Sequence, residues 1–229
     1  MSETAIVAFA KDPDNVQVKT RLSSFFNRPQ RNRIYEALLN GCLKQLSGLV
    51  DCKLYLACFP SSRSAFFTNL EMLYGFNLLD QKGKDLGERL ENCFSELLET
   101  HKRVIIFGTD VALLPLQEIS TCIESDTNRD ILIGPSLDGG YFAIGKNSDI
   151  NCSIFENVIW GSENVLAQTR ENCSKNNLKI HYLKTVRDID TDHDLKALKK
   201  ELLEQQNSNQ QSDELEIKQV LLELKNFPM

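Results

Sequence analysis

Basic residues are scarce in this sequence of 229 residues, which has 26 lysines and arginines against 32 aspartates and glutamates and a formal net charge of -6. Proteins that bind DNA or RNA need a basic surface to meet the phosphates, so nucleic acid is not an expected partner. Long hydrophobic runs are also lacking. The first apolar segment, residues 4–10, has no basic region before it and passes directly into charged residues. We therefore expect no signal peptide and no membrane span.

Several familiar site motifs are absent. The seven cysteines show no CxxC or CxxH spacing, which is typical of reduced, buried thiols in a cytoplasmic protein. The three histidines, His101, His181 and His193, have no metal-ligand spacing, and we expect each to be exposed or to cap a helix. No P-loop, no GxGxxG after the first apolar segment and no GxSxG occurs. The corresponding nucleotide-binding and hydrolase classes are therefore not favoured.

Short apolar runs alternate with helix-like segments along most of the chain. This pattern predicts an α/β fold, with a mainly parallel twisted sheet covered by helices on both faces. With 41% hydrophobic residues, a chain of this length can bury one substantial core. The expected strands are 5–9, 53–58, 76–79, 104–107, 131–133, 141–144 and 179–183.

Two helical segments carry apolar residues at helical spacing. We expect both stripes to be core: Ile34, Leu38, Cys42 and Leu46 in the first helix, and Leu86, Leu90, Phe94 and Leu97 in the second.

The domain organisation follows from a change in composition near the C-terminus. Residues 1–204 are expected to form one domain. Residues 205–213 contain no apolar side chain and are interpreted as a polar linker. Residues 214–229 are expected to include a further helix, because apolar residues resume a helical spacing over 215–224.

Three cations lie in the segment that directly follows the first strand. Residues 11–22 contain Lys11, Lys19 and Arg21 in an otherwise acidic protein. If that segment is extended, Lys19 and Arg21 share a face. The planar fork of arginine and the point charge of lysine suit diphosphate oxygens, so the segment is a candidate phosphate clamp. A solvated basic turn explains the same residues equally well.

A carboxylate follows a strand whose apolar character predicts a central position in the sheet. Asp110 ends the run Phe107-Gly108-Thr109-Asp110. A carboxylate at such a place needs a cation, and Mg²⁺ or Mn²⁺ held by one or two carboxylates plus nucleotide phosphates meets that need. Alternatively, Asp110 caps the helix that begins near Pro115, although the distance along the chain makes that cap awkward.

A glycine-rich turn separates two expected strands. The run Asp138-Gly139-Gly140 is a common hairpin connection, which accounts for it without any ligand. Two adjacent glycines also let a ligand approach the backbone closely. On this second interpretation, Asp138 could orient or deprotonate a substrate hydroxyl.

Four aspartates lie between the last expected strand and the helix that follows it. Thr191 or Asp192 is well placed to cap that helix, with Asp194 in its first turn. Asp188 and Asp190 remain. Because they are two residues apart in an extended segment they point the same way, and one of them could be the second metal ligand opposite Asp110.

These segments, together and in this order, resemble the bacterial family of radical-SAM/selenodomain-associated transferase 1. That family is related to the molybdenum cofactor and 2-phospho-lactate guanylyltransferases, and its fold resembles the nucleotide-diphospho-sugar transferase (glycosyltransferase-A) type. The matching stretches are 11–22, 83–89, Gly108-Thr109-Asp110, 134–141, Trp160-Gly161-Ser162 and Asp188-Ile189-Asp190-Thr191. Three positions depart from the family pattern: Asn15 replaces a turn glycine, Val111-Ala112 replaces Cys-Pro, and Gly161-Ser162 replaces Ser-Thr.

The resemblance implies roles for individual residues. It makes Lys19 and Arg21 nucleotide phosphate contacts, with Lys11, Gly83 and Asp85 also on the nucleotide side. It makes Asp110 the metal aspartate, and it places Asp138 with Gly139, Gly140, Tyr141 and Trp160 on the acceptor side.

The function that we expect is transfer of a nucleotidyl or glycosyl group from a nucleotide or nucleotide-sugar donor to a small-molecule acceptor. A metal at Asp110, together with Lys19 and Arg21, would stabilise the negative charge that develops on phosphate. One alternative is a nucleotide-binding protein without turnover. Another is an interaction module whose C-terminal helix docks a partner or a second copy, giving a homodimer.

Overall fold

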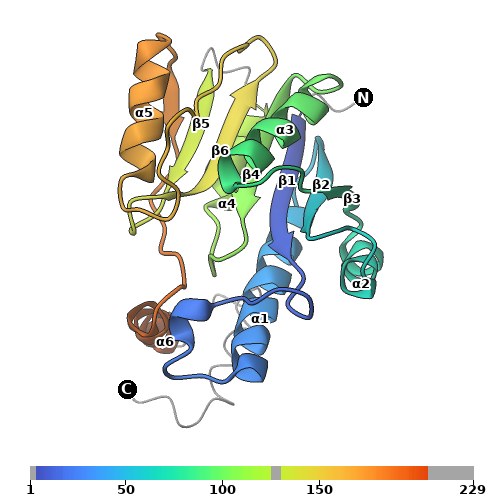
Figure 1. Ribbon diagram of the computed structural model, residues 1–229, viewed down its shortest axis with the longest axis vertical. Coiled ribbons are helices and arrows are strands. Elements are labelled where there is room, and N and C mark those ends of the chain that lie inside the picture. Colours follow the sequence, from blue (N-terminus) through green and yellow to red (C-terminus); the bar gives the residue numbers. More distant parts are fainter. Residues whose placement is uncertain (1–3, 125–129, 206–229) are drawn as a thin grey trace.

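The computed structural model describes residues 4–124 and 130–205, which form a seven-stranded sheet with helices on both faces (Figure 1). The strand order is β3-β2-β1-β4-β6-β5-β7. The strands are β1 (Thr4–Lys11), β2 (Cys52–Phe59), β3 (Asn77–Asp80), β4 (Arg103–Gly108), β5 (Ile131–Pro135), β6 (Tyr141–Asn147) and β7 (Ile180–Tyr182). Each predicted strand is present, and β4 is the middle strand, as its sequence predicts.

The sheet is mainly parallel. Strand β1 pairs in parallel with β2 and β4, β2 with β3, and β5 with β7. Strand β6 is antiparallel to both of its neighbours, β4 and β5. The carboxyl ends of β1, β4 and β5 therefore lie on one edge of the sheet, which is where ligands bind in open α/β folds.

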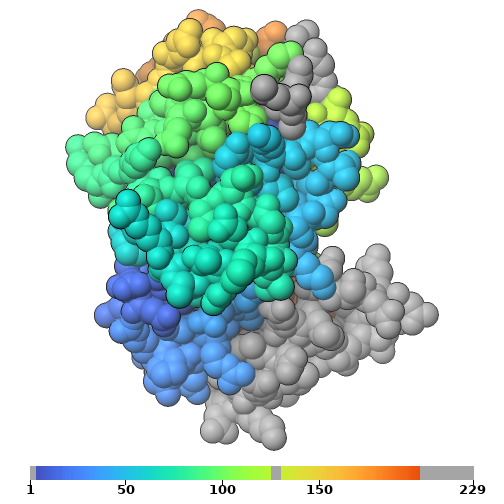
Figure 2. Space-filling view, turned by 90° about the vertical axis from the view of Figure 1, so that its right-hand side faces the viewer, coloured from blue at the N-terminus to red at the C-terminus, as the bar shows by residue number. Residues whose placement is uncertain are grey.

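The helices are α1 (Arg28–Ser47), α2 (Ala65–Tyr74), α3 (Leu86–Leu98), α4 (Leu116–Glu124), α5 (Val165–Lys175) and α6 (Asp192–Gln205), with a short 3-10 helix, η1 (Thr20–Leu22). Helices α1, α2 and α4 pack on one face of the sheet, and α3 and α5 on the other. Helix α2 and the segments around β2 and β3 form the outer surface on the side shown in Figure 2.

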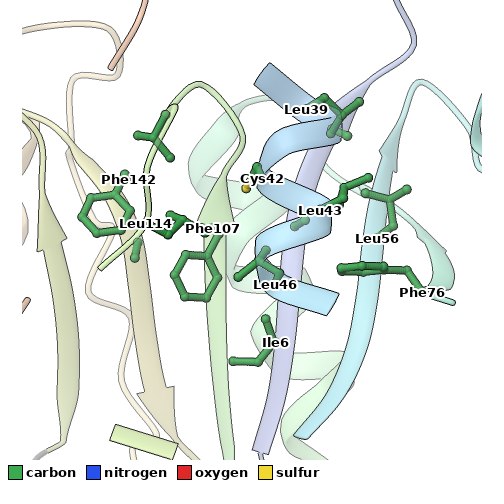
Figure 3. Close-up of a cluster of buried hydrophobic side chains, with 14 of the residues drawn as sticks. Ile6, Leu39, Cys42, Leu43, Leu46, Leu56, Phe76, Phe107, Leu114 and Phe142 are labelled. Carbon is green, nitrogen blue, oxygen red and sulfur yellow. The ribbon is translucent and has the colours of Figure 1, made fainter. Parts of the chain in front are cut away.

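Successive side chains of a strand point to opposite faces of the sheet, so each strand contributes to two separate cores. In β1, Ile6 and Ala8 contact the α1 side, whereas Ala5 and Val7 contact the α3 side. All four are fully buried, as expected for a strand with helices on both faces. Figure 3 shows the α1 side, where Leu39, Cys42, Leu43 and Leu46 of α1 face Ile6, Leu56 and Phe107 of the sheet.

A capping box fixes the start of α1. The Asn27 side chain accepts from the Gln30 backbone, and the Gln30 side chain accepts in return from the Asn27 backbone. The predicted stripe of α1 is buried from Ile34 to Leu46, which confirms that helix face as core.

Two local predictions are wrong. Leu86 is exposed and not part of the α3 stripe, because it is the first residue of the helix and precedes the turn that meets the sheet. His101 is buried, so the alternative of an exposed histidine is wrong, whereas its contact with the last turn of α3 agrees with a capping role. Its ring packs edge-to-face on Tyr55, and its Nδ1 lies 3.1 Å from the Leu97 carbonyl oxygen near the end of α3.

Helix α6 lies beyond the carboxyl ends of the strands, next to η1 and α1 (Figure 1). Its Leu195 and Leu198 pack with Leu22, Ile34 and Leu38 in a third apolar cluster. The predicted linker begins at the last residue of α6, and the rest of that linker and the helix expected within 214–229 lie outside the described residues. None of the described helices is long and apolar enough to cross a membrane.

Candidate functional site

A cavity of about 220 Å³ lies at the carboxyl ends of β1 and β4. Strand β1 contributes its last residues, the loop to η1 forms one side, and the residues after β4 and before α6 form the other. The lining residues are Phe9, Lys11, Gln17, Val18, Lys19, Thr20, Arg21, Tyr35, Thr109, Asp110 and Asp190. The cavity therefore brings the candidate phosphate clamp together with two of the candidate metal ligands.

Lys19 is the centre of this site. Its Nζ lies 2.5 Å from Asp110 Oδ1 and 3.1 Å from Asp190 Oδ1, and it donates a 2.6 Å hydrogen bond to the Ile189 carbonyl oxygen. Only 2% of the side chain is exposed. Burial alone would lower the pKa of Lys19, but the carboxylates of Asp110 and Asp190 outweigh burial and raise the pKa above its ordinary value. Lys19 is therefore a charged, fixed group.

The backbone around Lys19 corrects the expectation of an extended segment. Lys19 has φ 48° and ψ 44°, a left-handed conformation, and η1 starts directly after it. This turn sends the Lys19 side chain inward, while Arg21 remains at the surface with 55% of its side chain exposed. The Arg21 Nη1 lies 3.7 Å from Asp190 Oδ2. The two cations thus lie at different oxygens of the same carboxylate.

Lys11, the third cation, ends β1 and is exposed. Its backbone is fixed by Tyr35 of α1: the Lys11 N–H donates to the Tyr35 hydroxyl at 2.6 Å, and that hydroxyl donates to the Lys11 carbonyl at 3.0 Å. Lys11 and Arg21 therefore supply positive charge at the surface of a cavity in which Lys19 is already paired.

Asp110 does not cap the next helix. Helix α4 begins at Leu116, and the Asp110 carboxylate contacts Lys19 instead, with 46% of the side chain exposed. The Asp110 carbonyl accepts a 2.8 Å hydrogen bond from the Ile189 N–H, and Val111 forms an isolated bridge with Asp188. The segments 110–112 and 188–190 are thus paired, which places the carboxylates of Asp110 and Asp190 against the same Lys19 nitrogen.

Asp188 is half-buried and lies two residues before Asp190 in the same segment. Burial raises the pKa of its carboxyl to about 7, and the charges of Asp138, Asp110 and Asp190 add to the rise, whereas the Ser136 hydroxyl opposes it. The carboxylates of Asp110, Asp138, Asp188 and Asp190 thus come from three separate loops. Lys19 contacts two of these carboxylates, those of Asp110 and Asp190.

Asp138 sits in the turn between β5 and β6. The Ser136 hydroxyl donates to Asp138 Oδ1 at 2.7 Å, and the Gly140 N–H donates to the same oxygen at 2.9 Å. Both bonds fix the orientation of the carboxylate, and the residue is exposed. The turn is the hairpin connection that its sequence predicts.

The other acceptor-side candidates hold this turn in place and do not line the cavity. Gly139 has φ 87°, and a Cβ there would lie 2.1 Å from the Glu163 carbonyl oxygen, so the chain packs where only glycine fits. The Tyr141 and Trp160 rings meet edge-to-face at 6.5 Å, and the indole also covers Gly87.

Gly83 and Asp85, expected on the nucleotide side, do not line the cavity either. Asp85 is the N-cap of α3 and accepts from the Glu88 N–H at 2.9 Å. Gly83 has φ 139°, and its carbonyl accepts from the Arg89 side chain. Their local contacts account for both residues.

The carboxylates at the cavity could supply some of the ligands of a metal ion, but not a complete set. Within residues 4–124 and 130–205, no group of three or more histidine, cysteine or acidic side chains is arranged to hold one. Asp110 and Asp190 offer two partly exposed carboxylates. That set matches Mg²⁺ sites in which one or two carboxylates are completed by substrate phosphates and water, rather than sites built by protein alone.

Several lining residues have no distinguishing mark in the sequence. Tyr35 belongs to the buried face of α1, where aromatic and apolar residues look alike. Thr109 donates to the Phe9 carbonyl at 3.2 Å and so joins β4 to β1 beside the cavity. Only the adjacency of β1 and β4, which local patterns do not specify, brings these residues to the site.

The chain matches one family model and is similar to two curated proteins. A family model described as "Uncharacterized protein conserved in bacteria (DUF2064)" matches residues 42–162. Two 2-phospho-L-lactate guanylyltransferases are each 27% identical to this chain. The match to the Methanothermobacter thermautotrophicus protein covers 61% of this chain and 64% of that protein. The match to the Methanocaldococcus jannaschii protein covers 54% and 51%. This chain therefore spans less than two thirds of the length of either relative.

A solved structure is similar over almost its full length. It is that of a protein from Desulfovibrio desulfuricans G20 assigned as a nucleotide-diphospho-sugar transferase, and it has a TM-score of 0.84 and 26% sequence identity. The comparison covers 99% of each chain. The fold is thus of the nucleotide-diphospho-sugar transferase type.

Proposed function

The chain belongs to the DUF2064 family of bacterial proteins, and from that premise we propose that it is a metal-dependent nucleotidyltransferase acting on a small-molecule acceptor. The observation that carries the proposal is the buried Lys19, which joins Asp110 and Asp190 at the carboxyl ends of central strands, beside a cavity with Arg21 and Lys11 at its surface. The guanylyltransferase names of both curated relatives support nucleotidyl transfer.

In this reaction an acceptor oxygen attacks the α-phosphorus of a nucleoside triphosphate. The new oxygen–phosphorus bond forms as the bond from Pα to the bridging oxygen breaks, and pyrophosphate leaves with the electron pair. Mg²⁺ or Mn²⁺, held by Asp110 and Asp190 and completed by the donor phosphates, would supply neutralisation of phosphate charge.

Residues of the protein bind the donor phosphates, position the two carboxylates and take the proton of the acceptor. Arg21 and Lys11 bind the donor phosphates, for which a planar fork and a point charge are suited. Lys19 holds Asp110 and Asp190 at a fixed separation, so the carboxylates need no rearrangement when the donor arrives. Asp138 orients the acceptor hydroxyl and takes its proton through the oxygen that is not bonded to Ser136 and Gly140.

Glycosyl transfer is the second candidate, favoured by the assignment of the Desulfovibrio desulfuricans structure. The same donor site serves attack at the sugar carbon, but the product then is a nucleoside diphosphate rather than pyrophosphate. Phosphorus NMR of the released product separates the two reactions.

The proposal is tested by thermal shift with GTP, CTP and UDP-glucose, each with and without Mg²⁺ or Mn²⁺. A ligand at a hundredfold excess over its Kd stabilises the native state by about 2.7 kcal/mol, which raises Tm by roughly 5–10 °C for a protein of this size. We expect this rise for a nucleotide only when the metal is present.

Asp110→Asn retains the shape of the side chain and removes its charge. The variant should keep its circular dichroism spectrum and lose the metal-dependent rise in Tm, whereas Asp149→Asn, which changes an exposed carboxylate outside the cavity, should keep it. No response of the natural protein to any nucleotide would contradict the proposal and favour an interaction module.

A further inference from the structure

A second cavity, of about 420 Å³, lies beside the candidate site. The paired segments 110–112 and 188–190 separate the two cavities: Asp110 and Asp190 line the first, whereas Ala112 and Ile189 line the second. The bridge between Val111 and Asp188 joins these segments. The second cavity therefore shares a wall with the place where the carboxylates gather.

The walls of this cavity are largely apolar. Leu113, Leu114 and Pro115 come from the loop before α4, Leu137 from the turn before β6, and Leu198 from α6. Leu114 also packs with Phe107 and Phe142 in the core (Figure 3), so the floor of the cavity is part of the rigid interior. Leu113 and Leu137 are 39% and 61% exposed. Exposed leucines around a concave apolar surface are typical of a ligand site.

Two cations, Lys184 and Arg187, and one carboxylate, Glu201, lie among the apolar residues. Lys184 is exposed, and its backbone N–H donates to Glu118 at 2.7 Å. Arg187 has only long ion pairs, 3.6 Å to Asp194 and 3.9 Å to Glu201, and its buried Nε has no hydrogen-bond partner among the described residues. A buried guanidinium nitrogen without a partner is costly unless another acceptor reaches it. Two cations against one carboxylate leave the lining with a net charge of +1, which suits one anionic group.

We infer that this second cavity binds an organic molecule with an apolar body and one anionic group, and that this molecule is the acceptor in the proposed reaction. The acceptor role rests on the proposed function, whereas the binding site itself does not. Leu137 lines the cavity directly before Asp138, and Arg187 directly before Asp188. The acceptor role requires the reactive end of the bound molecule to lie at Asp138 and Asp188, the next residues along the chain.

The size and polarity of the cavity set the ligand class. Volumes of roughly 300–1,000 Å³ with mostly apolar walls and a few polar groups are usual for binding sites of drug-sized molecules. A small acceptor with two anionic groups and almost no apolar surface, such as the phospho-lactate in the names of the curated relatives, would leave these leucines uncovered. The sequence also departs from the family pattern at Val111-Ala112, where Ala112 lines this cavity.

The inference is tested on the full chain with two fluorescent probes. 1-Anilinonaphthalene-8-sulfonate has an aromatic body and one anionic group, and N-phenyl-1-naphthylamine has the same body without the sulfonate. We expect saturable binding of the anionic probe at one site, at least tenfold tighter than that of the neutral probe. Leucine methyl NMR spectra should show probe-induced shifts at Leu113, Leu137 and Leu198.

Matched variants locate the probe. Leu137→Glu should weaken both probes at least tenfold, and Lys184→Glu should weaken only the anionic one. Leu73→Glu and Lys179→Glu are the controls and should change neither Kd by more than twofold. Leu73 is an exposed leucine outside the cavity, and Lys179, like Lys184, is exposed with its backbone N–H bonded to a carboxylate, that of Asp130.

Probe binding that is absent, or equally affected by the control variants, would overturn the inference. Because probe binding is measured without nucleotide, its outcome is independent of the thermal-shift test. If the probe binds here but no nucleotide binds elsewhere, the cavity remains a binding site and its acceptor role fails together with the proposed function.

Discussion

At the scale of single residues, the site depends on one buried cation. The sequence places Lys19, Arg21, Asp110 and Asp190 after strands, and the structure brings these four together. The Lys19 ammonium lies between the carboxylates of Asp110 and Asp190 and contacts both. Spacing along the chain could not predict this, because the inward turn depends on the left-handed backbone of Lys19, a conformation that lysine seldom adopts.

Replacing Lys19 by methionine should leave Asp110 and Asp190 facing each other without the ammonium between them. Breaking a buried ion pair costs about 3–5 kcal/mol, and we expect roughly 2 kcal/mol here because both carboxylates are partly exposed. Mg²⁺ should restore part of the lost stability, since a divalent cation can replace the ammonium. Chemical denaturation with and without Mg²⁺ measures both effects.

Lys146→Met is the control for this experiment. Lys146 is also buried, and it pairs with Glu91 at 3.5 Å away from the site. Its loss should destabilise the protein without any rescue by Mg²⁺. Equal rescue of both variants would mean that the cation acts elsewhere.

Arg21→Ala should weaken nucleotide binding about tenfold and leave the free energy of unfolding almost unchanged. An exposed charge 3.7 Å from its partner contributes little to stability, whereas a guanidinium that binds phosphate contributes strongly to affinity. Isothermal titration calorimetry gives the affinity. Arg63→Ala, an exposed arginine outside the cavity, should bind as the natural protein does; an unchanged Kd for Arg21→Ala would remove Arg21 from the donor site.

At the scale of secondary structure elements, sequence patterns succeed where one face of an element is buried. The α1 stripe and the strand runs are confirmed because burial imposes a period on the residue types. This periodicity does not predict the burial of residues at the ends of elements. Leu86 begins α3 and is exposed, and His101 follows α3 and is buried against Tyr55. Their surroundings come from neighbouring elements rather than from their own periodicity.

The packing of α3 on the loop before α5 offers a test at this scale. An alanine Cβ at Gly87 would lie 2.7 Å from Trp160 Nε1, so Gly87→Ala must displace the indole. We expect a loss of about 1–3 kcal/mol and a red shift of the emission of Trp160, the single tryptophan of the chain. Gly48→Ala, whose Cβ would make an ordinary 3.5 Å contact, should change neither quantity. Unshifted emission in Gly87→Ala would contradict the close packing of the indole on Gly87.

At the scale of the whole molecule, the fold class is confirmed but the place of β6 could not be derived. The sequence predicts the turn at Asp138-Gly139-Gly140, and a hairpin there fixes that β5 and β6 run in opposite directions. It does not determine that β6 inserts between β4 and β5, because that choice depends on contacts between residues far apart in the chain. The insertion sets the distance between the Asp138 turn and Asp110.

The reactivity of the cysteine thiols reports on the packing of the entire domain. Five of the seven are buried, namely Cys42, Cys58, Cys93, Cys122 and Cys173. Burial raises the pKa of Cys42, Cys58 and Cys93 to about 12 and that of Cys173 to about 11, so these thiols stay protonated and unreactive at neutral pH. Ellman's reagent should modify at most Cys52 and Cys152 in the native protein and all seven thiols in guanidinium chloride. Rapid modification of more than two native thiols would show that the cores open easily.

The contact between Lys19 and Asp190 spans 171 positions of the chain. During synthesis on the ribosome, β1 to β4 and the helices between them emerge long before residues 188–190 do. Domains begin to fold from the N-terminal side as they are made. Until the last segment leaves the exit tunnel, Lys19 lacks both Asp190 and the Ile189 carbonyl, and the proposed donor site is incomplete. If the proposed function holds, a nascent or prematurely terminated chain that ends before Asp190 cannot sequester nucleotide, however much of its sheet has formed.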